Sequence, residues 1–290
     1  MIKKKILVTG GAGFVGSHLC ERLAQDSNNE VYSLDNYFTG AIENHVRNVQ
    51  YIKGDTVNIK DLVTFTPDMV YHLGEYSRVE QSFDDIETVW RYNKDGIFAV
   101  LEFVRKAGCK ILYAGSSTKF GDGGMGRSAS PYAWTKASNT ELVMNYGNWF
   151  NIPYAITYFY NVYGRREIAT GKYATLIALL TEKMKSGEQL TVVSPGTQKR
   201  NFTHINDIID GLILVGENGY GDEFGIGSPD AFSILEVAQM FGGKVNMLPE
   251  RKGNRMTADV VSDKTKALGW SPKHSLQNYI ENLRKNNWNK

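Results

Sequence analysis

Short apolar runs recur along the first half of the chain, and longer amphipathic stretches separate them. Runs of this length that are rich in β-branched residues are typical of strands, and the stretches between them fit helices. Because parallel strands need crossover connections and helices supply them, the alternation predicts an α/β fold, a parallel sheet with helices on both faces. The expected strands are Lys5–Val8, Val31–Leu34, Val49–Lys53, Met69–Leu73, Lys110–Ala114 and Ala155–Phe159.

The alternation becomes looser after Gly164, where the pattern indicates a smaller region of mixed helices and strands. Glu188–Val193 and Gly221–Ile226 are typical of short strands in such a region. Gly121–Pro131 is rich in glycine and serine and predicts an exposed loop. We therefore expect a main domain followed by a smaller subdomain in the carboxyl-terminal part of the chain.

The composition is that of a folded globular protein, since 42% of the 290 residues are hydrophobic and 22% are charged. The 33 lysine and arginine residues nearly balance the 31 acidic residues, so bulk charge favours neither nucleic acid nor a membrane as a partner. The apolar run near the amino end is too short for a signal sequence or a membrane span, and we expect a cytoplasmic protein. Cys20 and Cys109 lack metal-type spacing, so the sequence predicts two buried thiols and neither a disulfide framework nor a metal site.

A glycine-rich turn joins the first expected strand to the following helix. The sequence from Val8 to Ser17 is Val-Thr-Gly-Gly-Ala-Gly-Phe-Val-Gly-Ser, which places Gly10, Gly13 and Gly16 at this turn. Glycines let a pyrophosphate approach the helix N-terminus, where free N–H groups and the positive end of the helix dipole favour an anion. A glycine triplet alone also fits an ordinary strand-to-helix turn.

Asp35, at the end of the second expected strand, gives the turn a cofactor context. Its carboxylate can accept hydrogen bonds from both hydroxyls of the adenosine ribose, and it would repel a 2′-phosphate. The turn and Asp35 together predict a Rossmann-type domain that binds NAD rather than NADP. Asp55 follows the third strand, where it either reaches the adenine amino group or forms a turn.

Tyr132 and Lys136 lie four residues apart in Ser-Pro-Tyr-Ala-Trp-Thr-Lys, on what the pattern predicts to be one face of a helix. A tyrosine hydroxyl has a pKa of ~10, and a nearby ammonium together with the nicotinamide charge favours the phenolate, which is a usable base. Taken alone, the pair also fits a helix surface. Ser116, however, is expected at the carboxyl end of a parallel strand, where such sheets bind ligands, and its hydroxyl can hold an alcohol oxygen against Tyr132.

These motifs resemble, in the same order, those of the extended short-chain dehydrogenase/reductase family, especially its nucleotide-sugar epimerases and dehydratases. The resemblance spans nearly the whole chain. It extends to His72-Leu73, Asn93-x-x-Gly96, Asn161-Val-Tyr-Gly164, Gln198-Lys-Arg200-Asn-Phe202 and Leu268-Gly-Trp-Ser-Pro272. It implies an NAD-binding Rossmann-type domain, a doubly wound parallel sheet, in residues 1–164, to which residues 203–218 return. The implied substrate-binding subdomain, of mixed α/β structure, comprises residues 165–202 and 219–290.

The resemblance also implies the site residues and an assembly. The implied catalytic residues are Ser116, Tyr132 and Lys136. The implied contacts of NAD are Gly10, Gly13, Phe14, Val15, Asp35, Asn36, Asp55, Thr56, Leu73, Gly74, Asn93, Tyr132 and Lys136. The implied contacts of a nucleotide-diphosphate sugar are Ser117, Thr118, Asn161, Arg200 and Arg251, and guanidinium groups suit diphosphate oxygens. In the family, helices equivalent to the regions Asn93–Arg105 and Ala137–Phe150 pair two subunits, which predicts a homodimer.

The residues after Ser116 depart from the pattern of two family reactions. Dehydratases follow the serine or threonine with an Asp-Glu pair, which is here Ser117-Thr118, so dehydration is disfavoured. Enzymes that invert carbons 3 and 5 have a cysteine where Thr118 stands, so double epimerisation is disfavoured as well. The common step that remains is oxidation at carbon 4 with NAD. We expect a 4-epimerase, which regenerates its own NAD. The alternative is a 4-dehydrogenase, for a hexose or a GDP-heptose, whose NADH a second substrate reoxidises.

Three further positions differ from the family pattern. Glu75 replaces a small residue, and it either binds a sugar hydroxyl or faces solvent. Tyr158 replaces an arginine and Asn201 an acid, and both changes are expected to alter which nucleotide or sugar fits. The pattern leaves the nucleotide and the sugar open. A regulatory nucleotide-binding module or an interaction scaffold is disfavoured because the catalytic set is complete.

Overall fold

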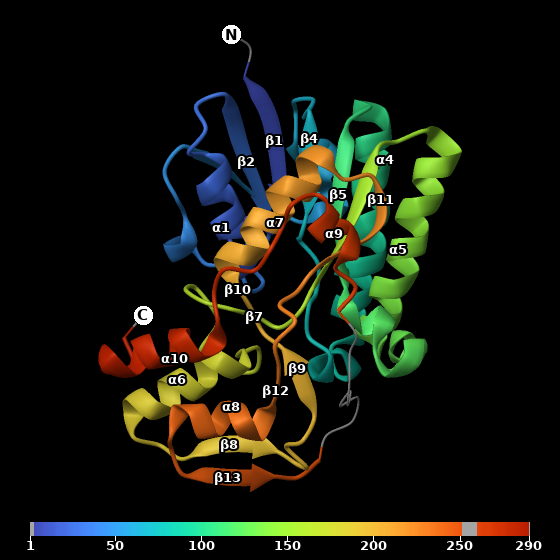
Figure 1. Cartoon of the computed structure of the whole chain (residues 1–290). Coiled ribbons are helices and arrows are strands. Elements are labelled where there is room, and N and C mark those ends of the chain that lie inside the picture. The colour runs from blue at the N-terminus through green and yellow to red at the C-terminus, as the bar shows by residue number, and fades with distance from the viewer. Residues whose placement is uncertain (1–2, 251–259, 290) are drawn as a thin grey trace.

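Seven parallel strands form the central sheet of the protein (Figure 1). The structure is a computed structural model, and it describes residues 3–250 and 260–289. The strand order is β11-β6-β5-β4-β1-β2-β3, and every neighbouring pair runs parallel. All six strands expected in the first half of the chain are present, so the predicted α/β fold is confirmed. The strands of this sheet are β1 (Lys4–Thr9), β2 (Asn29–Asp35), β3 (Val49–Lys53), β4 (Met69–His72), β5 (Lys110–Ser116), β6 (Tyr154–Phe159) and β11 (Gly221–Ile226).

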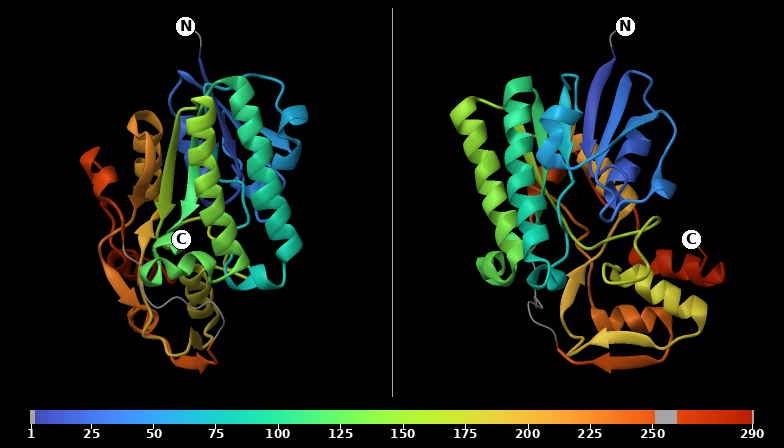
Figure 2. Two further views of the ribbon diagram at one scale, coloured as in Figure 1. Left: turned by 90° about the vertical axis from the view of Figure 1, so that its right-hand side faces the viewer. Right: turned by 180° about the vertical axis from the view of Figure 1, so that it is seen from behind.

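Helices cover both faces of the sheet (Figure 2). Helices α1 and α7 pack on one face, and α2, α4 and α5 pack on the other. Within β1, Leu7 points to the second group while Ile6 and Val8 point to the first, because successive side chains of a strand alternate between faces. Both faces are therefore buried, which explains the continuous apolar runs in the sequence. The bounds are α1 (Phe14–Leu23), α2 (Ile59–Leu62), α4 (Gly96–Ala107), α5 (Pro131–Phe150) and α7 (Ile205–Asn218).

A smaller region with its own apolar core lies below the carboxyl edge of the sheet (Figure 1). Its core includes Leu180, Val192, Phe241 and Ile280, which are all fully buried. The expected strand Glu188–Val193 is present here as β8. The elements of this region are α6 (Leu176–Ser186), β8 (Leu190–Val193), β9 (Lys199–Asn201), β12 (Ala231–Ser233), α8 (Ile234–Phe241), β13 (Val245–Leu248) and α10 (Leu276–Lys285). Three short elements, β7 (Val162–Tyr163), β10 (Thr203–His204) and α9 (Asp263–Ala267), complete the connections.

The strand Gly221–Ile226 was expected in the smaller region, and this expectation is wrong. It is β11, the edge strand of the central sheet, and it pairs in parallel with β6. The preceding helix α7 supplies the crossover that carries the chain back to the sheet. Trp270 also returns to the main domain, since it packs in the core beside α1 and α7 and its Nε1 donates to the carbonyl oxygen of Asp207 at 2.8 Å.

A π-helical segment, η4 (Trp90–Asp95), joins α3 (Ile86–Val89) to α4. The helix expected at Asn93–Arg105 is thus present, but its first turn is wider than an α-helical turn and leaves Asn93 fully buried. The expected loop at Gly121–Pro131 contains short 3₁₀ turns and an exposed Met125. Across the described ranges, every helix is too short or too polar to span a membrane.

Candidate active site

A cavity of about 730 Å³ lies between the carboxyl edge of the sheet and the smaller region. This volume is in the usual range for sites that bind small molecules. The ends of β1, β2, β4 and β5 form one wall, and side chains of the smaller region, such as Thr191 and Phe202, form part of the other. Parallel strands deliver their carboxyl ends to one edge, so residues far apart in the chain meet here.

The glycine turn after β1 forms the cavity wall beside β2. Gly10 has a φ of +73°, and a Cβ at Gly16 would lie 2.0 Å from the carbonyl oxygen of Gly10, so the turn requires both glycines. Gly13, Phe14 and Val15 also line the cavity. Among the described residues, no side chain caps the first turn of α1, so its N–H groups remain available to an anion. The turn therefore fits a dinucleotide pyrophosphate.

Asp35 ends β2 and is held in place by two backbone donors. Its Oδ2 accepts from the N–H of Ala12 and its Oδ1 from the N–H of Tyr37, both at 2.8 Å. Burial raises the pKa of the Asp35 carboxyl from its ordinary value, although these two hydrogen bonds oppose that shift. Two backbone donors thus leave further lone pairs of the carboxylate for ribose hydroxyls, as the adenosine end of NAD requires.

The three predicted catalytic residues come from two neighbouring elements and line the same cavity. Ser116 is the last residue of β5, and its Oγ accepts from the hydroxyl of Thr118 at 2.9 Å. Tyr132 and Lys136 lie in the first turns of α5. This helix begins at Pro131, and Ser130 caps it by accepting from the backbone N–H at position 133. The predicted helix and the shared face of the Tyr-Lys pair are therefore present.

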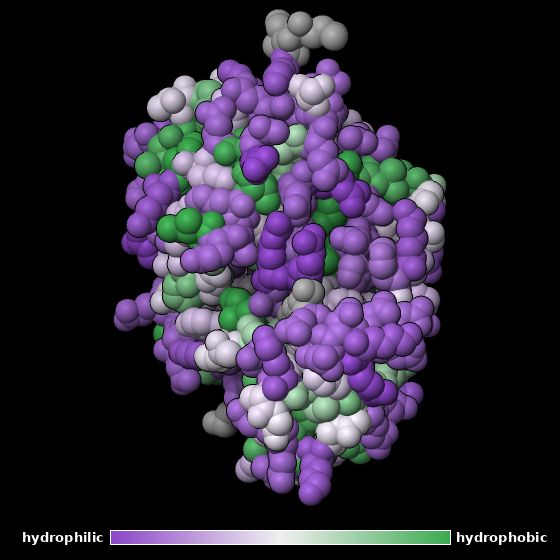
Figure 3. Space-filling model, turned by 90° about the vertical axis from the view of Figure 1, so that its left-hand side faces the viewer, coloured by the Kyte–Doolittle hydropathy of each residue, from purple (hydrophilic) through white to green (hydrophobic). Residues whose placement is uncertain are grey.

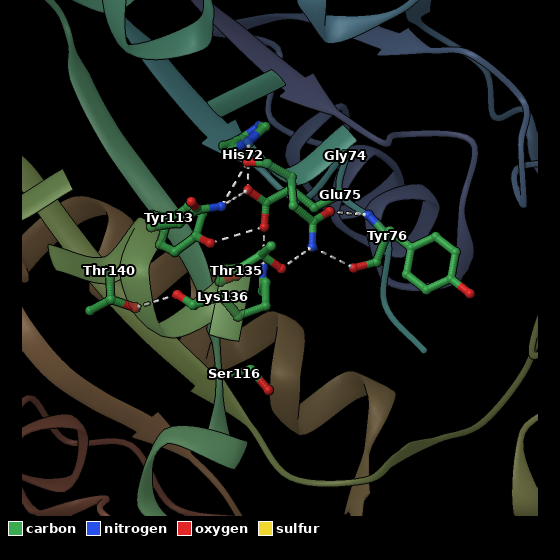
Figure 4. A network of polar contacts seen from close by, with 12 residues as sticks. His72, Gly74, Glu75, Tyr76, Tyr113, Ser116, Thr135, Lys136 and Thr140 are labelled. Atoms are coloured by element: carbon green, nitrogen blue, oxygen red, sulfur yellow. Dashed lines mark hydrogen bonds and ion pairs between the residues drawn. The ribbon is translucent and has the colours of Figure 1, made fainter. Parts of the chain in front are cut away.

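The carboxylate of Glu75 lies against Lys136, and further polar side chains converge on it (Figure 4). Lys136 Nζ is 2.5 Å from Glu75 Oε2, and the two side chains are only 7% and 2% exposed. Tyr113 donates to the same oxygen at 2.9 Å, and Asn139 donates to Oε1 at 3.0 Å. His72 Nε2 lies 3.5 Å from Oε1. Glu75 therefore does not face solvent, contrary to one of the two expectations, and it engages Lys136.

The Glu75–Lys136 pair is ionic although it is buried. Burial alone would raise the pKa of Glu75, but the Lys136 charge and the contact with His72 outweigh it and lower the pKa to about 2. Burial and the Glu75 charge raise the pKa of Tyr113 well above its ordinary value, so Tyr113 keeps its proton and remains a donor. Lys136 also donates to the carbonyl oxygen of Ala114. Its ammonium group is thus fixed between two acceptors at the cavity wall.

Most of the predicted site residues meet at the cavity. Asn161 and Arg200 reach it from the segments that lead into the smaller region, and Asn161 Nδ2 donates to the carbonyl oxygen of Asn201 at 2.9 Å. The predicted residues that line the cavity are Gly10, Gly13, Phe14, Val15, Asp35, Asn36, Thr56, Leu73, Gly74, Ser116, Ser117, Thr118, Tyr132, Lys136, Asn161 and Arg200.

The structure does not bring Asp55 and Asn93 to the cavity wall. Asp55 caps a short turn by accepting from the N–H of Val57 at 3.3 Å, which is the turn-forming alternative, and Arg91 lies 3.0 Å from its other oxygen. Asn93 holds the backbone of Tyr76 from behind the wall, where its Oδ1 accepts from the N–H at 2.7 Å. Their predicted contacts with NAD have no support in this geometry. Arg251 lies outside the described residues.

Arg78 lines the cavity, and sequence analysis missed it. Its Nε and Nη2 donate to the carbonyl oxygen of Tyr173 at 3.0 and 2.7 Å, and burial lowers its pKa from the ordinary value. Lys172 and Tyr173 in turn contact the carboxylate of Asp85. Two loops that are distant in the sequence thus close over one side of the cavity. The sequence feature that could have identified Arg78 was its position a few residues after the expected strand Met69–Leu73.

Tyr158 and Asn201, the two departures from the family pattern that were expected to alter ligand fit, lie behind the cavity wall. Tyr158 donates to Asp222 Oδ1 at 2.5 Å and accepts from Lys119 Nζ at 3.1 Å. Asn201 Nδ2 donates to the carbonyl oxygen of Ser228 at 3.0 Å. Neither Tyr158 nor Asn201 is among the residues that line the cavity.

Comparisons with known proteins give the family to which the chain belongs. A family model described as the NAD dependent epimerase/dehydratase family matches residues 6–227. UDP-glucuronic acid decarboxylase 5 of Arabidopsis thaliana is 30% identical over 297 residues, which cover 94% of this chain and 86% of the relative. The solved structure of UDP-glucose 4-epimerase from Thermotoga maritima is 26% identical, with a TM-score of 0.89 and coverage of 97% and 99%. That of UDP-glucuronic acid 4-epimerase from Bacillus cereus, with UDP-glucuronic acid and NAD, is 28% identical, with a TM-score of 0.85 and coverage of 96% for each chain.

The chain belongs to the NAD-dependent epimerase/dehydratase family, and NAD is its cofactor. The predicted resemblance to the extended short-chain dehydrogenases/reductases and the predicted cofactor are both confirmed. The glycine turn suits the pyrophosphate of NAD, and the buried carboxylate of Asp35 suits its adenosine ribose.

We expect Asp35→Ala to improve the binding of NADP relative to NAD by about tenfold, because it removes a charge that repels the 2′-phosphate. Calorimetric titration of the variant with each cofactor gives the two Kd values, and their ratio is insensitive to any loss of folded protein. Asp61→Ala, which removes an exposed carboxylate on α2, is the matched control. An unchanged ratio in the Asp35 variant would show that the preference for NAD arises elsewhere.

Proposed function

We propose that this member of the NAD-dependent epimerase/dehydratase family oxidises the carbon-4 hydroxyl of a nucleotide-activated sugar and acts as a 4-epimerase. The observation that carries the proposal is that Ser116, Tyr132 and Lys136 line the same cavity as the Gly10 turn and Asp35. A single cavity thus offers groups that suit a dinucleotide and groups that suit the deprotonation of an alcohol.

Each residue has a role that its contacts support. Ser116 Oγ already accepts a hydrogen bond from Thr118, which leaves its own proton free to donate to the sugar oxygen and hold it beside Tyr132. Tyr132 accepts the hydroxyl proton as carbon 4 becomes a carbonyl. NAD, which the turn at Gly10 and the carboxylate of Asp35 would hold, would supply the hydride acceptor for carbon 4. Glu75 holds the ammonium group of Lys136 in place, and Lys136 lines the cavity together with Tyr132.

The 4-epimerase is favoured because the groups for other reactions are missing or engaged. Elimination of water needs an acid-base pair next to Ser116, and Ser117 and Thr118 carry hydroxyl groups only. Glu75 is a carboxylate near the cavity, but Lys136 and its other donors occupy it. Oxidation and reduction at carbon 4 need no further acid or base, and return of the hydride to the opposite face of the sugar closes the redox cycle.

Two other outcomes of the same oxidation remain candidates. A 4-dehydrogenase would release the keto sugar, and a second substrate would reoxidise the cofactor. A decarboxylase would act on a sugar acid, and the relatives named as UDP-glucuronic acid decarboxylases favour it. Such a substrate needs a cation for its carboxylate, and Arg78 and Arg200 both line the cavity.

Proton NMR distinguishes these reactions directly. UDP-, GDP- and dTDP-hexoses, a GDP-heptose and UDP-glucuronic acid are each incubated with the protein and a small excess of NAD. A new anomeric signal that reaches equilibrium without NADH supports the 4-epimerase. A keto sugar that appears in step with NADH indicates the 4-dehydrogenase, and loss of carbon dioxide from UDP-glucuronic acid indicates the decarboxylase. No change in any sugar would overturn the proposal.

Tyr132→Phe should lower kcat by about 10³-fold, because it removes the group that accepts the hydroxyl proton. The Kd for NAD should change little, since the ring and its packing are kept. Steady-state rates on the sugar that NMR identifies, together with calorimetric titration of NAD, measure both quantities. Normal turnover by the variant would remove Tyr132 from the mechanism.

We also propose that two copies of the chain pair through the face formed by α4 and α5. Large aromatic side chains are exposed on this face and just before it: Phe98 is 56% exposed, Trp149 62% and Trp90 50%. The ring of Trp90 in η4 stacks on the ring of Trp134 in α5, with 6.0 Å between the ring centroids. This contact extends the apolar surface from η4 onto α5. The two helices lie side by side in Figure 2, while the opposite side of the molecule is mainly hydrophilic (Figure 3). Apolar patches of this kind mark interfaces, and the family resemblance supports a second copy as the partner.

Phe98→Glu should convert the dimer to a monomer, because it places a charge in the centre of the proposed apolar interface. The mass that light scattering gives at micromolar protein concentration should fall from twice the chain mass to the chain mass of 32.5 kDa. Ile42→Glu is the matched control, since Ile42 is 69% exposed in the short turn between β2 and β3 and should leave the mass unchanged. A monomeric mass for the unaltered protein would contradict the proposed interface.

A further inference from the structure

Arg78 brings a positive charge to the cavity wall, and its side chain is only partly exposed. It lies in the loop after β4, where its Nε and Nη2 donate to the carbonyl oxygen of Tyr173. Its Nη1 donates to the carbonyl oxygen of Ser77 at 3.0 Å and to the Ser77 hydroxyl at 3.1 Å. Every acceptor of these four hydrogen bonds is therefore a neutral oxygen.

No carboxylate of the described residues forms an ion pair with Arg78. Glu167 also lines the cavity, and its charge acts on Arg78 from a distance. Its own oxygens accept from the N–H of Gly164 and from the hydroxyl of Thr175. Moving a guanidinium out of water costs free energy that neutral acceptors offset only in part, so such groups are normally paired with an anion. The cavity thus presents a cation whose anion a ligand can supply.

Arg78 lies near the end of the cavity where the proposed reaction takes place. Burial lowers the pKa of Arg78, and the hydroxyl of Tyr132 opposes this shift more than Tyr76, Glu167 or Tyr173 does. Arg78 and Tyr132 are therefore within electrostatic range of each other. The groups that suit phosphates come from other elements, since the turn at Gly10 follows β1 and Arg200 lies on β9.

The substituents of the sugar ring decide which anion can reach Arg78. In the proposed function Tyr132 accepts the proton of the carbon-4 hydroxyl, so carbon 4 lies at Tyr132. Carbon 5 is bonded to carbon 4 and carries carbon 6, which is a carboxylate in a sugar acid. The diphosphate is attached to carbon 1, across the ring from carbon 4. A cation near Tyr132 is therefore closer to the carboxylate of a sugar acid than to the diphosphate.

We propose that the substrate is a nucleotide-activated sugar acid and that Arg78 binds its carbon-6 carboxylate. The inference rests on the proposed function to the extent that carbon 4 of a nucleotide-activated sugar binds at Tyr132. A guanidinium has five N–H groups, so one on Nη2 is unused, and displacement of the exposed Ser77 hydroxyl frees a second on Nη1. N–H groups on the two terminal nitrogens suit the two oxygens of a carboxylate. A neutral hexose, which has only a hydroxyl at carbon 6, leaves the charge of Arg78 unpaired.

The test compares the binding of sugar acids with that of the matching neutral hexoses. The pairs are UDP-glucuronic acid with UDP-glucose, dTDP-glucuronic acid with dTDP-glucose, and GDP-mannuronic acid with GDP-mannose. Calorimetric titrations use the Tyr132→Phe protein saturated with NAD, which should bind a sugar without oxidising it. The Kd of at least one acid should be about tenfold or more below the Kd of its hexose, because only the acid forms a charge-assisted hydrogen bond with Arg78.

Arg78→Gln, added to the same protein, should raise the Kd of that acid by about tenfold or more, because it removes the cation that pairs with the carboxylate. The Kd of the matching hexose and the Kd for NAD should be nearly unchanged. Arg22→Gln is the matched control, since it removes an exposed guanidinium from the last turn of α1, at the end of that helix away from the cavity.

Two further measurements keep the test decisive if Arg78→Gln fails to fold. Arg78→Lys retains the charge but cannot donate two parallel hydrogen bonds, so the acid should lose a smaller part of its advantage over the hexose. The carbon-6 amide of the acid keeps the shape of the sugar and removes its charge, so the protein with Arg78 should bind the amide as weakly as the hexose. The acid and the amide, each measured with and without Arg78→Gln, give the coupling between the carboxylate and Arg78.

Equal Kd values for acid and hexose in every pair would overturn this inference alone, provided that a hexose binds and is epimerised by the unaltered protein. A preference for the acid that persists in Arg78→Gln would also overturn it. A rise of the Kd for acid and hexose alike would assign Arg78 to the diphosphate, and a rise of the Kd for NAD would assign it to the cofactor, so either result contradicts the inference. If neither member of any pair binds, the proposed function fails together with the inference.

Discussion

The parallel direction of the seven strands decides where this protein can carry out chemistry. Since all carboxyl ends meet at one edge, the turn at Gly10, the carboxylate of Asp35 and the hydroxyl of Ser116 share one cavity although they are far apart in the chain. Helix α5 follows β5 and packs on the same face, which brings Tyr132 and Lys136 to that edge. The smaller region then closes the cavity from below. The carboxyl edge of the sheet and α5 thus supply the cofactor-binding and catalytic side chains, and the smaller region supplies the opposite wall.

The buried pair of Glu75 and Lys136 adds a second constraint to this arrangement. Removal of one partner from a buried ion pair costs about 3–5 kcal/mol, because it leaves an uncompensated charge in an apolar environment. The loop after β4 and the start of α5 are therefore tied together at the point where the cofactor must bind. Tyr113 and Asn139 complete the shell around the carboxylate, which makes the position of Lys136 a property of the fold.

Features with a local signal could be predicted from the sequence. The glycine turn, the carboxylate at the end of β2 and the Tyr-Lys spacing on one helix each depend on neighbouring residues, and all of them reach the cavity. Contacts between distant segments could not be predicted. Glu75 was noticed as a departure from the family pattern, but its partner Lys136 is 61 residues away. The edge strand β11 was misplaced for the same reason, since its pairing with β6 depends on where α7 returns the chain.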